Sequence, residues 1–385
     1  MLKSSSPLLQ PSQNPVLHAL LKHTFYAQFC VGETTAEVER TLSAIKEAGY
    51  SGVILEFALE VLDTAPPTAA ISAAQTEREI STWRTGVLQS IAATQAGDYV
   101  GLKWSGLGAE ALRRLGRADA PSAAMAAAIQ DVCDEAARKA VRLLPGAEME
   151  WMNGGIDAWT LDAMRRYNRA GRPVMFNTYQ AYLKSTPAKL ARHLCAAEAE
   201  GFVLGAKIVR GAYLAAEPRD RVWASKAETD RCYDGLVEAV LRRQWNGTLE
   251  APDGAKDAAF PSVSLVIASH NLPSVRKAMA IRNMQARTGE ERVDCAYAQL
   301  YGMADDVSAV LLEASKAAVQ EEVKGESLDR PVALKCATWG TLDECLNFLL
   351  RRAAENKDAA GRTADTRKAM GKELGRRFRA IFALA

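Results

Sequence analysis

The chain has 385 residues, of which 48% are hydrophobic and 24% charged, and its formal net charge is +2. This is the composition of an ordinary globular protein, and so small a charge favours neither nucleic acid nor an anionic membrane surface. From the charge we expect no nucleic-acid partner. No apolar run is long enough to cross a bilayer, so we also expect no integral membrane segment.

The N-terminal segment carries little sign of a targeting signal. Its first 32 residues contain no acidic residue and no arginine, and Lys3 and Lys22 are its only lysines. Mitochondrial transit peptides are usually rich in arginine. This segment is therefore a weak match to a transit peptide, which favours a cytoplasmic location. We expect residues 1–48 to form a helical N-terminal segment and residues 49–385 a single large domain.

Short β-rich runs then alternate with helical patterns along the chain. The helical patterns include AEVERTLSAIKEAG (36–49) and TLDAMRRYNRAG (160–171). The predicted strands are GVILEF (52–57), YVGLKW (99–104), AEMEW (147–151), PVMFN (173–177), VLGAKIV (203–209), SLVIAS (264–269), CAYAQL (295–300) and VALKCAT (332–338). Eight strands alternating with helices predict an α/β fold of the (β/α)₈ TIM type. The alternative is an open doubly wound sheet, but no G-x-G-x-x-G follows a strand.

Polar residues fall at the ends of these strands, where the active sites of such barrels lie. Each has a structural interpretation when taken alone, since a strand lysine is often a snorkelling residue and a single histidine is often structural. Together they predict a pocket for a polar, anionic ligand. The residues are Lys103, Asn177, Lys207, Arg210, Tyr213, Ser269, His270, Asn271 and Gln299.

A last amphipathic helix adds a cation on an apolar stripe. T-L-D-E (341–344) fits a capping box, and Cys345, Phe348 and Leu349 follow at helical spacing. Arg352 continues that stripe one turn later, where a cation must snorkel, pair or face a bound anion. Arg351 has a plainer interpretation, an exposed pair with Glu355.

The cysteines and histidines argue against a metal site or a disulfide framework. The seven cysteines are scattered, odd in number and contain no C-x-x-C, which predicts reduced thiols. No two of the four histidines sit at positions i and i+4 of a helix. We therefore expect no bound metal.

Several motifs, in order and over nearly the whole chain, resemble the proline dehydrogenase (proline oxidase) family, and its fungal branch in particular. They are HTFYAQFCVGET (23–34), GYSGVILEFALEV (49–61), GLKWSGLG (101–108), FNTYQAYLK (176–184), AKIVRGAYL (206–214), ASHN (268–271), QLYGMADD (299–306) and LLRRAAEN (349–356). The resemblance implies a distorted (β/α)₈ barrel that holds FAD, with residues 340–356 as a substrate-clamp helix over the barrel mouth. It also implies oxidation of a cyclic secondary amine to the imine by hydride transfer to flavin N5, with a quinone or oxygen as the final electron acceptor. The family is mitochondrial, in contrast to the weak transit peptide.

The resemblance also assigns roles to individual residues. Arg351 and Arg352 would clamp the substrate carboxylate beside Lys103, and Lys207 would lie near flavin N5. Tyr213, Leu300 and Cys336 would line the substrate pocket. The cofactor would be contacted by Asn177, Lys207, Arg210, Ser269, His270, Asn271, Gln299 and Glu355.

Two positions depart from the family pattern. Gly146 stands where the family has aspartate, and Cys336 stands where it usually has tyrosine. Losing one partner of this hydrogen-bonded pair would leave a buried polar group at a cost of about 1–3 kcal/mol, whereas losing both avoids that cost. The sequence therefore predicts a larger, less polar pocket and a substrate such as proline, hydroxyproline or a substituted analogue. The alternatives are the same flavin barrel repurposed for another reaction and inactive on proline, and a binding protein that has lost its flavin.

Overall fold

The computed structural model of the chain describes residues 11, 13–59, 67, 71–169, 171–253, 259–323 and 327–358. These residues belong to two compact units, one comprising Ala27–Thr341 and the other the residues up to Tyr26 with those from Leu342 onward. The boundaries therefore differ from the predicted division at residue 48, which stays a prediction.

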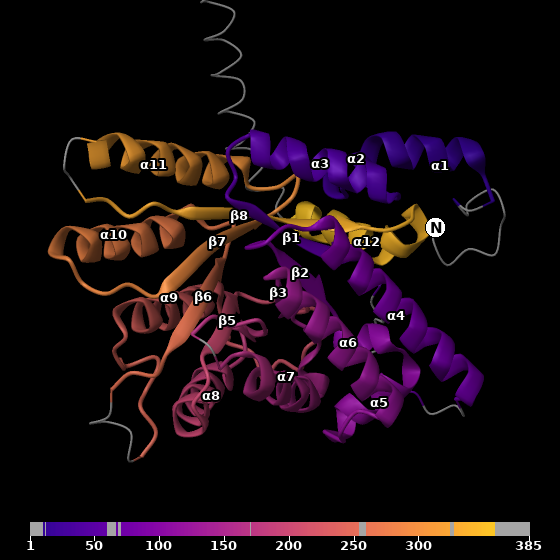
Figure 1. The fold of residues 1–385 in the computed structure, drawn as a ribbon, viewed down its shortest axis with the longest axis horizontal. Coiled ribbons are helices and arrows are strands. Elements are labelled where there is room, and N and C mark those ends of the chain that lie inside the picture. Colours follow the sequence, from indigo (N-terminus) through magenta and orange to yellow (C-terminus); the bar gives the residue numbers. More distant parts are fainter. Residues whose placement is uncertain are drawn as a thin grey trace, which may run out of the picture. The chain divides into compact units, whose positions relative to one another are not determined.

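The unit Ala27–Thr341 contains a nearly closed barrel of eight parallel strands surrounded by helices (Figure 1). The sheet order is β3-β2-β1-β8-β7-β6-β5-β4, and a bridge between Leu143 and Met175 joins its two edges. The strands are β1 (Gly52–Phe57), β2 (Tyr99–Leu102), β3 (Arg142–Pro145), β4 (Phe176–Gln180), β5 (Leu204–Val209), β6 (Val263–Ala268), β7 (Asp294–Leu300) and β8 (Val332–Trp339). The predicted (β/α)₈ barrel is thus confirmed, and the open doubly wound sheet is wrong.

The helices begin where the sequence supplies capping residues. Thr34, Ser72, Ser122, Ser225 and Asn271 each accept a hydrogen bond from the first turn of the helix that follows. The helices of this unit are α2 (Ala27–Phe29), α3 (Thr35–Glu47), α4 (Ala73–Ala93), α5 (Ala109–Arg117), α6 (Ala123–Lys139), α7 (Asn153–Tyr167), α8 (Thr186–Glu200), α9 (Lys226–Arg242), α10 (Leu272–Thr288) and α11 (Asp305–Val323), with the short helices η3 (Trp104–Leu107) and η4 (Glu150–Met152). The other unit contains α1 (Pro15–Leu21), η2 (Lys22–Tyr26) and α12 (Leu342–Asp358).

The third and fourth strands lie elsewhere than predicted. The third is β3, which ends at Pro145, so the prediction of a strand at residues 147–151 is wrong. The fourth strand begins three residues later than predicted, because the Asn168 side chain forms hydrogen bonds with the backbone of the residues just before Phe176. Asn168 Oδ1 accepts from the amides of Val174 and Met175, and its Nδ2 donates to the Met175 carbonyl, at 2.7–2.9 Å.

Side chains of each strand alternate between the barrel interior and the helix layer. One buried cluster joins inward residues of seven strands: Ile54, Tyr99, Leu144, Phe176, Val266, Ala296, Ala298, Leu334 and Cys336. The outward residues pack against the helices in two other clusters. Membership of these clusters therefore shows which face of a strand each neighbouring residue occupies.

None of the seven cysteines, all of which lie in the described ranges, forms a disulfide bond. Among the described residues, no helix is long and apolar enough to cross a membrane.

The outer face of β4 carries a buried polar network. Tyr179 Oη lies 2.8 Å from His193 Nδ1 on α8, and Asn177 Nδ2 donates to Asp157 Oδ1 on α7 at 2.8 Å. Asp157 also pairs with Lys189 at 2.7 Å. Burial is the main cause that lowers the pKa of His193 from 6.5 to about 4, and the charges of Lys189 and Arg192 act in the same direction. His193 is therefore neutral in the folded protein at pH 7.

We predict that His193 makes the protein less stable in mild acid. Between pH 6.5 and 4 the unfolded chain binds a proton at His193 that the folded chain does not, so stability falls as the pH falls through this window. Full development of the effect is worth about 3 kcal/mol. Urea denaturation of the native protein and of His193→Gln at pH 7 and pH 4.5 should show a steeper loss for the native protein. Equal losses would contradict the buried, neutral histidine.

Candidate active site at the barrel mouth

The inward positions at the carboxyl ends of the strands form a ring of mostly polar residues. Alternation from the interior cluster places them on the inner face. They are Glu56 of β1, Lys103 directly after β2, Thr178 and Gln180 of β4, Lys207 of β5, and Cys336 and Thr338 of β8.

Lys103 is a buried cation held by the backbone. Its side chain is 9% exposed, and Nζ donates to the carbonyl of Ala147 at 2.6 Å and reaches Tyr213 Oη at 3.5 Å. It forms no ion pair with any carboxylate in the described part of the chain. An ammonium group has three donors, so Lys103 keeps one for a ligand.

The surroundings of Lys103 keep it charged. Burial by itself lowers the pKa of Lys103, but interactions with Tyr213, Glu56 and Glu148 outweigh it and raise the pKa above its usual value. Tyr213 is itself 9% exposed, and burial raises its pKa. A buried, protonated lysine without a carboxylate partner is what an anion-binding pocket needs.

The end of the Lys103 side chain fills the space that a side chain at Gly146 would need. A Cβ atom at this position would lie 2.7 Å from Lys103 Nζ and 3.0 Å from its Cε. The absence of a side chain at residue 146 thus lets the Lys103 ammonium group approach the backbone just after β3. The departure noted in the sequence therefore lies directly at the predicted carboxylate site.

Residues 145–148, at the end of β3 and just after it, accept two hydrogen bonds from side chains of β4, besides the one from Lys103. The carbonyl of Pro145 accepts from Thr178 Oγ1 at 2.7 Å, and that of Glu148 accepts from Gln180 Nε2 at 2.8 Å. The Glu148 carboxylate is 3% exposed and accepts from the amide of Ser105 at 3.2 Å, while burial raises its pKa. Residues 145–148 thus fix Lys103, Thr178 and Gln180 at once.

Gln180 is a candidate site residue that the sequence interpretation missed. It is 3% exposed and points inward, and its Oε1 atom has no hydrogen-bond partner among the described residues. A buried amide oxygen left unpaired in this way is expected to meet a ligand donor. The signal was present in the motif FNTYQAYLK, but the strand was placed three residues too early.

Lys207 also faces inward. It lies between the outward residues Ala206 and Ile208, is half-buried, and forms no hydrogen bond or ion pair in the described ranges. Lys207 therefore faces the barrel interior, as a lysine near the flavin would have to.

Three other predicted cofactor residues meet at the ends of β5 and β6. Arg210 donates to Asp230 at 2.7 Å and to the hydroxyls of Ser269 and Ser274 at 2.9 Å, and its guanidinium lies 4.2 Å from the Tyr233 ring centroid. Asn271 caps α10 by accepting from Ser274 N at 3.1 Å. The N-terminus of a long helix beside an arginine favours phosphate groups.

His270 and Leu300 are also brought together. His270 Nε2 accepts from the amide of Leu300 at 3.1 Å, and the Leu300 side chain packs on the interior cluster. Cys336 is 8% exposed on the inner face of β8, beside Leu300 in the strand register. These three residues therefore line the same interior.

Asn177 and Gln299 point away from the interior. Asn177 belongs to the outer network of β4, and Gln299 Nε2 donates to the Ser269 carbonyl while its Oε1 accepts from Ser308. Strand alternation explains both placements, because each lies one residue from an inward neighbour. The structure thus does not bring these two amides to the lumen, where their predicted contact with the cofactor would be made.

Helix α12 carries the two predicted clamp arginines. Arg352 is 6% exposed with its guanidinium 5.3 Å from the Phe348 ring centroid, and Arg351 is half-buried. By contrast, Arg165 and Arg166 are 38% and 62% exposed and pair with Glu200 and Asp162. Arg352 is thus much more buried than either arginine of this second Arg-Arg pair. The Glu355 side chain lies outside the described residues.

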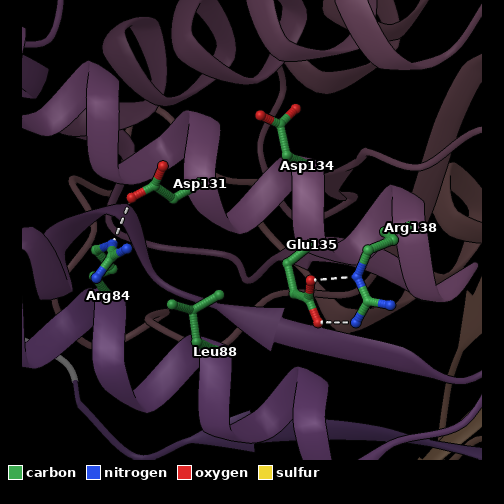
Figure 2. A pocket seen from close by; sticks show the side chains of 6 residues that line it. All are labelled: Arg84, Leu88, Asp131, Asp134, Glu135 and Arg138. Atoms are coloured by element: carbon green, nitrogen blue, oxygen red, sulfur yellow. Dashed lines mark hydrogen bonds and ion pairs between the residues drawn. The ribbon is translucent and has the colours of Figure 1, made fainter.

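A charged pocket of about 480 Å³ lies elsewhere, on α4 and α6 (Figure 2). Its lining includes Arg84, which pairs with Asp131 at 2.6 Å, and Arg138, which pairs with Glu135. These charges satisfy each other on the outer helix layer, so this pocket is not the candidate active site.

Comparison with known proteins identifies the family to which the sequence is similar. The family model described as proline dehydrogenase matches residues 38–365. The chain is 32% identical to a probable mitochondrial proline dehydrogenase of Schizosaccharomyces pombe, over 64% of this chain and 49% of that protein. It is 27% identical to a hydroxyproline dehydrogenase of Bos taurus, over 94% of this chain and 82% of that protein. The chain spans about half the length of the first of these relatives.

The fold has solved counterparts. The chain superposes on proline utilization A from Bdellovibrio bacteriovorus, inactivated by N-propargylglycine, with a TM-score of 0.64 and 15% identity, over 89% of this chain and 34% of that one. At this identity the likeness establishes a common fold. Because the family model covers most of the sequence, the chain belongs to the proline dehydrogenase family.

Proposed function

We propose that this protein is an FAD-dependent oxidoreductase that oxidises a carboxylate-bearing cyclic secondary amine to the imine. The observation that carries the proposal is Lys103, a buried cation in the barrel interior with no carboxylate partner among the described residues. Its free donor fits one end of an amino acid's carboxylate. Proline and hydroxyproline dehydrogenases among the relatives support this reaction over a repurposed flavin barrel.

The inward residues fit a flavin, on which this family generally depends. The unpaired Oε1 of Gln180 is an acceptor for a ring N–H, and Lys207 is an unpaired cation on the same inner face. Arg210, Ser269 and Asn271 at the start of α10 suit the phosphates of FAD. A flavin bound there would supply the hydride acceptor. The charge of Lys207 would offset negative charge that develops on the ring.

The residues of this chain would supply binding and orientation. Lys103 is proposed to hold the substrate carboxylate and so fix the ring carbon that loses its hydride. The family resemblance gives the role of carboxylate clamp to Arg351 and Arg352 as well. Cys336 leaves more room than a tyrosine would, whereas the space beside Gly146 is filled by the Lys103 side chain. We therefore propose that the substrate is proline, hydroxyproline or a ring-substituted analogue.

Electron acceptor and location are also proposals. A quinone or oxygen would reoxidise the flavin. Relatives named as mitochondrial favour an intracellular, mitochondrial location over a cytoplasmic one.

The purified protein should be yellow, and anaerobic addition of proline or hydroxyproline should bleach the flavin absorbance. The bleaching follows from transfer of two electrons to the bound ring. A visible spectrum followed by anaerobic titration measures both. A protein that takes up no flavin, or whose flavin no cyclic amino acid reduces, would contradict the proposal.

Lys103→Met should lower kcat/KM about 10- to 100-fold, because it removes a charge-assisted hydrogen bond worth about 1.5–3 kcal/mol. Flavin content should stay near that of the native protein. Lys226→Met is the matched control, since Lys226 is 67% exposed on α9. Steady-state kinetics that leave Lys103→Met equal to this control would remove Lys103 from the substrate site.

Arg352→Ala should raise the substrate KM steeply, by about 100-fold, with flavin content nearly unchanged, because a bidentate contact to the carboxylate is lost. Arg166→Ala serves as control, since Arg166 is 62% exposed and belongs to the second Arg-Arg pair, Arg165–Arg166 on α7. An unchanged KM in Arg352→Ala would exclude the proposed clamp.

A further inference from the structure

Glu56 is an inward carboxylate to which the family resemblance gives no role. It lies on β1 between Leu55 and Phe57, which face the helix layer, so its own side chain faces the barrel interior. It is half-buried, and within the described ranges its carboxylate forms no hydrogen bond or ion pair. A carboxylate in the barrel interior without a protein donor is available to a ligand.

A glycine on the next strand makes room for this side chain. Gly101 is the register partner of Glu56 on β2, and a Cβ there would lie 3.0 Å from Glu56 Cβ and 3.4 Å from its Cδ. The Glu56 side chain therefore lies across β2 on the inner face. Lys103, two residues after Gly101, shares that face but forms no ion pair with Glu56.

Thr338 on β8 provides a second unused polar group beside Glu56. It is the register partner of Glu56 on the other side, and its inward direction follows from its outward neighbours Ala337 and Trp339. Thr338 is 2% exposed, and its Oγ1 has no hydrogen-bond partner among the described residues. A buried hydroxyl left unpaired is destabilising, and a ligand that forms a hydrogen bond with it would remove that cost.

We propose that Glu56 and Thr338 form a subsite that binds a hydroxyl group on the ring of the substrate. The inference rests on the proposed oxidation of a cyclic amino acid and names the substituent that the site selects. An ionised carboxylate only accepts hydrogen bonds, whereas a threonine hydroxyl both donates and accepts. A substrate hydroxyl can donate to Glu56 and accept from Thr338, and so satisfies both groups.

The neighbouring positions are consistent with a substituent on this side. Cys336 lies two residues before Thr338 on the same inner face of β8, and Gly146 has no side chain beside Lys103. Lys103 would hold the carboxylate from β2, while the hydroxyl would meet β1 and β8. The subsite thus separates the two polar ends of a hydroxylated ring.

The test uses the full-length flavin-loaded protein with proline and 4-hydroxyproline as the matched pair of probes. Thr338→Val keeps the side-chain shape and removes the hydroxyl, and Glu56→Gln removes the charge. Each should lower the ratio of kcat/KM for hydroxyproline to that for proline about 10-fold, because the substrate hydroxyl loses a partner in a buried site. Asp162→Asn, on the exposed face of α7, is the control and should leave the ratio unchanged.

Thermal stabilisation by saturating amino acid provides a second readout that needs no turnover. The native protein should be stabilised more by hydroxyproline than by proline, and Thr338→Val should abolish that difference. If Glu56→Gln fails to bind flavin, Thr338→Val decides by itself.

The outcomes separate the two proposals. Flavin that neither amino acid reduces contradicts the proposed oxidation, and the stabilisation measurement then still tests the subsite. Native protein that oxidises proline but neither binds nor oxidises hydroxyproline overturns the subsite while leaving the oxidation intact. Ratios in Thr338→Val that stay within twofold of the Asp162→Asn control overturn it as well.

Discussion

The hydrogen bond from Lys103 to the carbonyl of Ala147 is the contact on which the candidate site depends. It holds a buried cation with a backbone dipole, and no carboxylate in the described part of the chain forms a direct ion pair with it, so a donor of the ammonium group stays available to a ligand. The same short segment accepts from Gln180 through Glu148, which couples the position of the cation to that of an unpaired amide. One stretch of irregular backbone after β3 therefore positions the groups proposed to bind substrate and cofactor.

The distribution of polar groups divides the barrel interior into two parts. Lys207 and Gln180 lie on β5 and β4, and the phosphate-suited Arg210 lies just beyond β5. Glu56 and Thr338 lie on β1 and β8, across from them in the sheet order. The proposed cofactor and substrate would thus contact different strands of one ring, so that substrate specificity could change without loss of cofactor binding.

The error in the predicted position of the fourth strand shows how strand placement decides which residues are assigned to the site. The sequence places the strand at residues 173–177 and so selects Asn177, whereas Asn168 delays the strand to Phe176–Gln180. Successive side chains of a strand face opposite sides, so Asn177 and Gln180, which are three residues apart, lie on opposite faces. Asn177 then belongs to the network with Asp157 behind the sheet, and Gln180 becomes the inward amide.

The amino-acid pattern by itself determined the barrel, the family, and the positions of Lys103 just after the second strand and Lys207 within the fifth. Strand-helix alternation and local motifs depend on residues that are neighbours in the sequence. It also marked Arg352 as an arginine on an apolar stripe, which its 6% exposure bears out. Only the tertiary structure decided that Gln180 faces inward and that Glu56 and Thr338 are neighbours. Their proximity arises from the pairing of the first strand with the last, a contact between distant residues that no local pattern encodes.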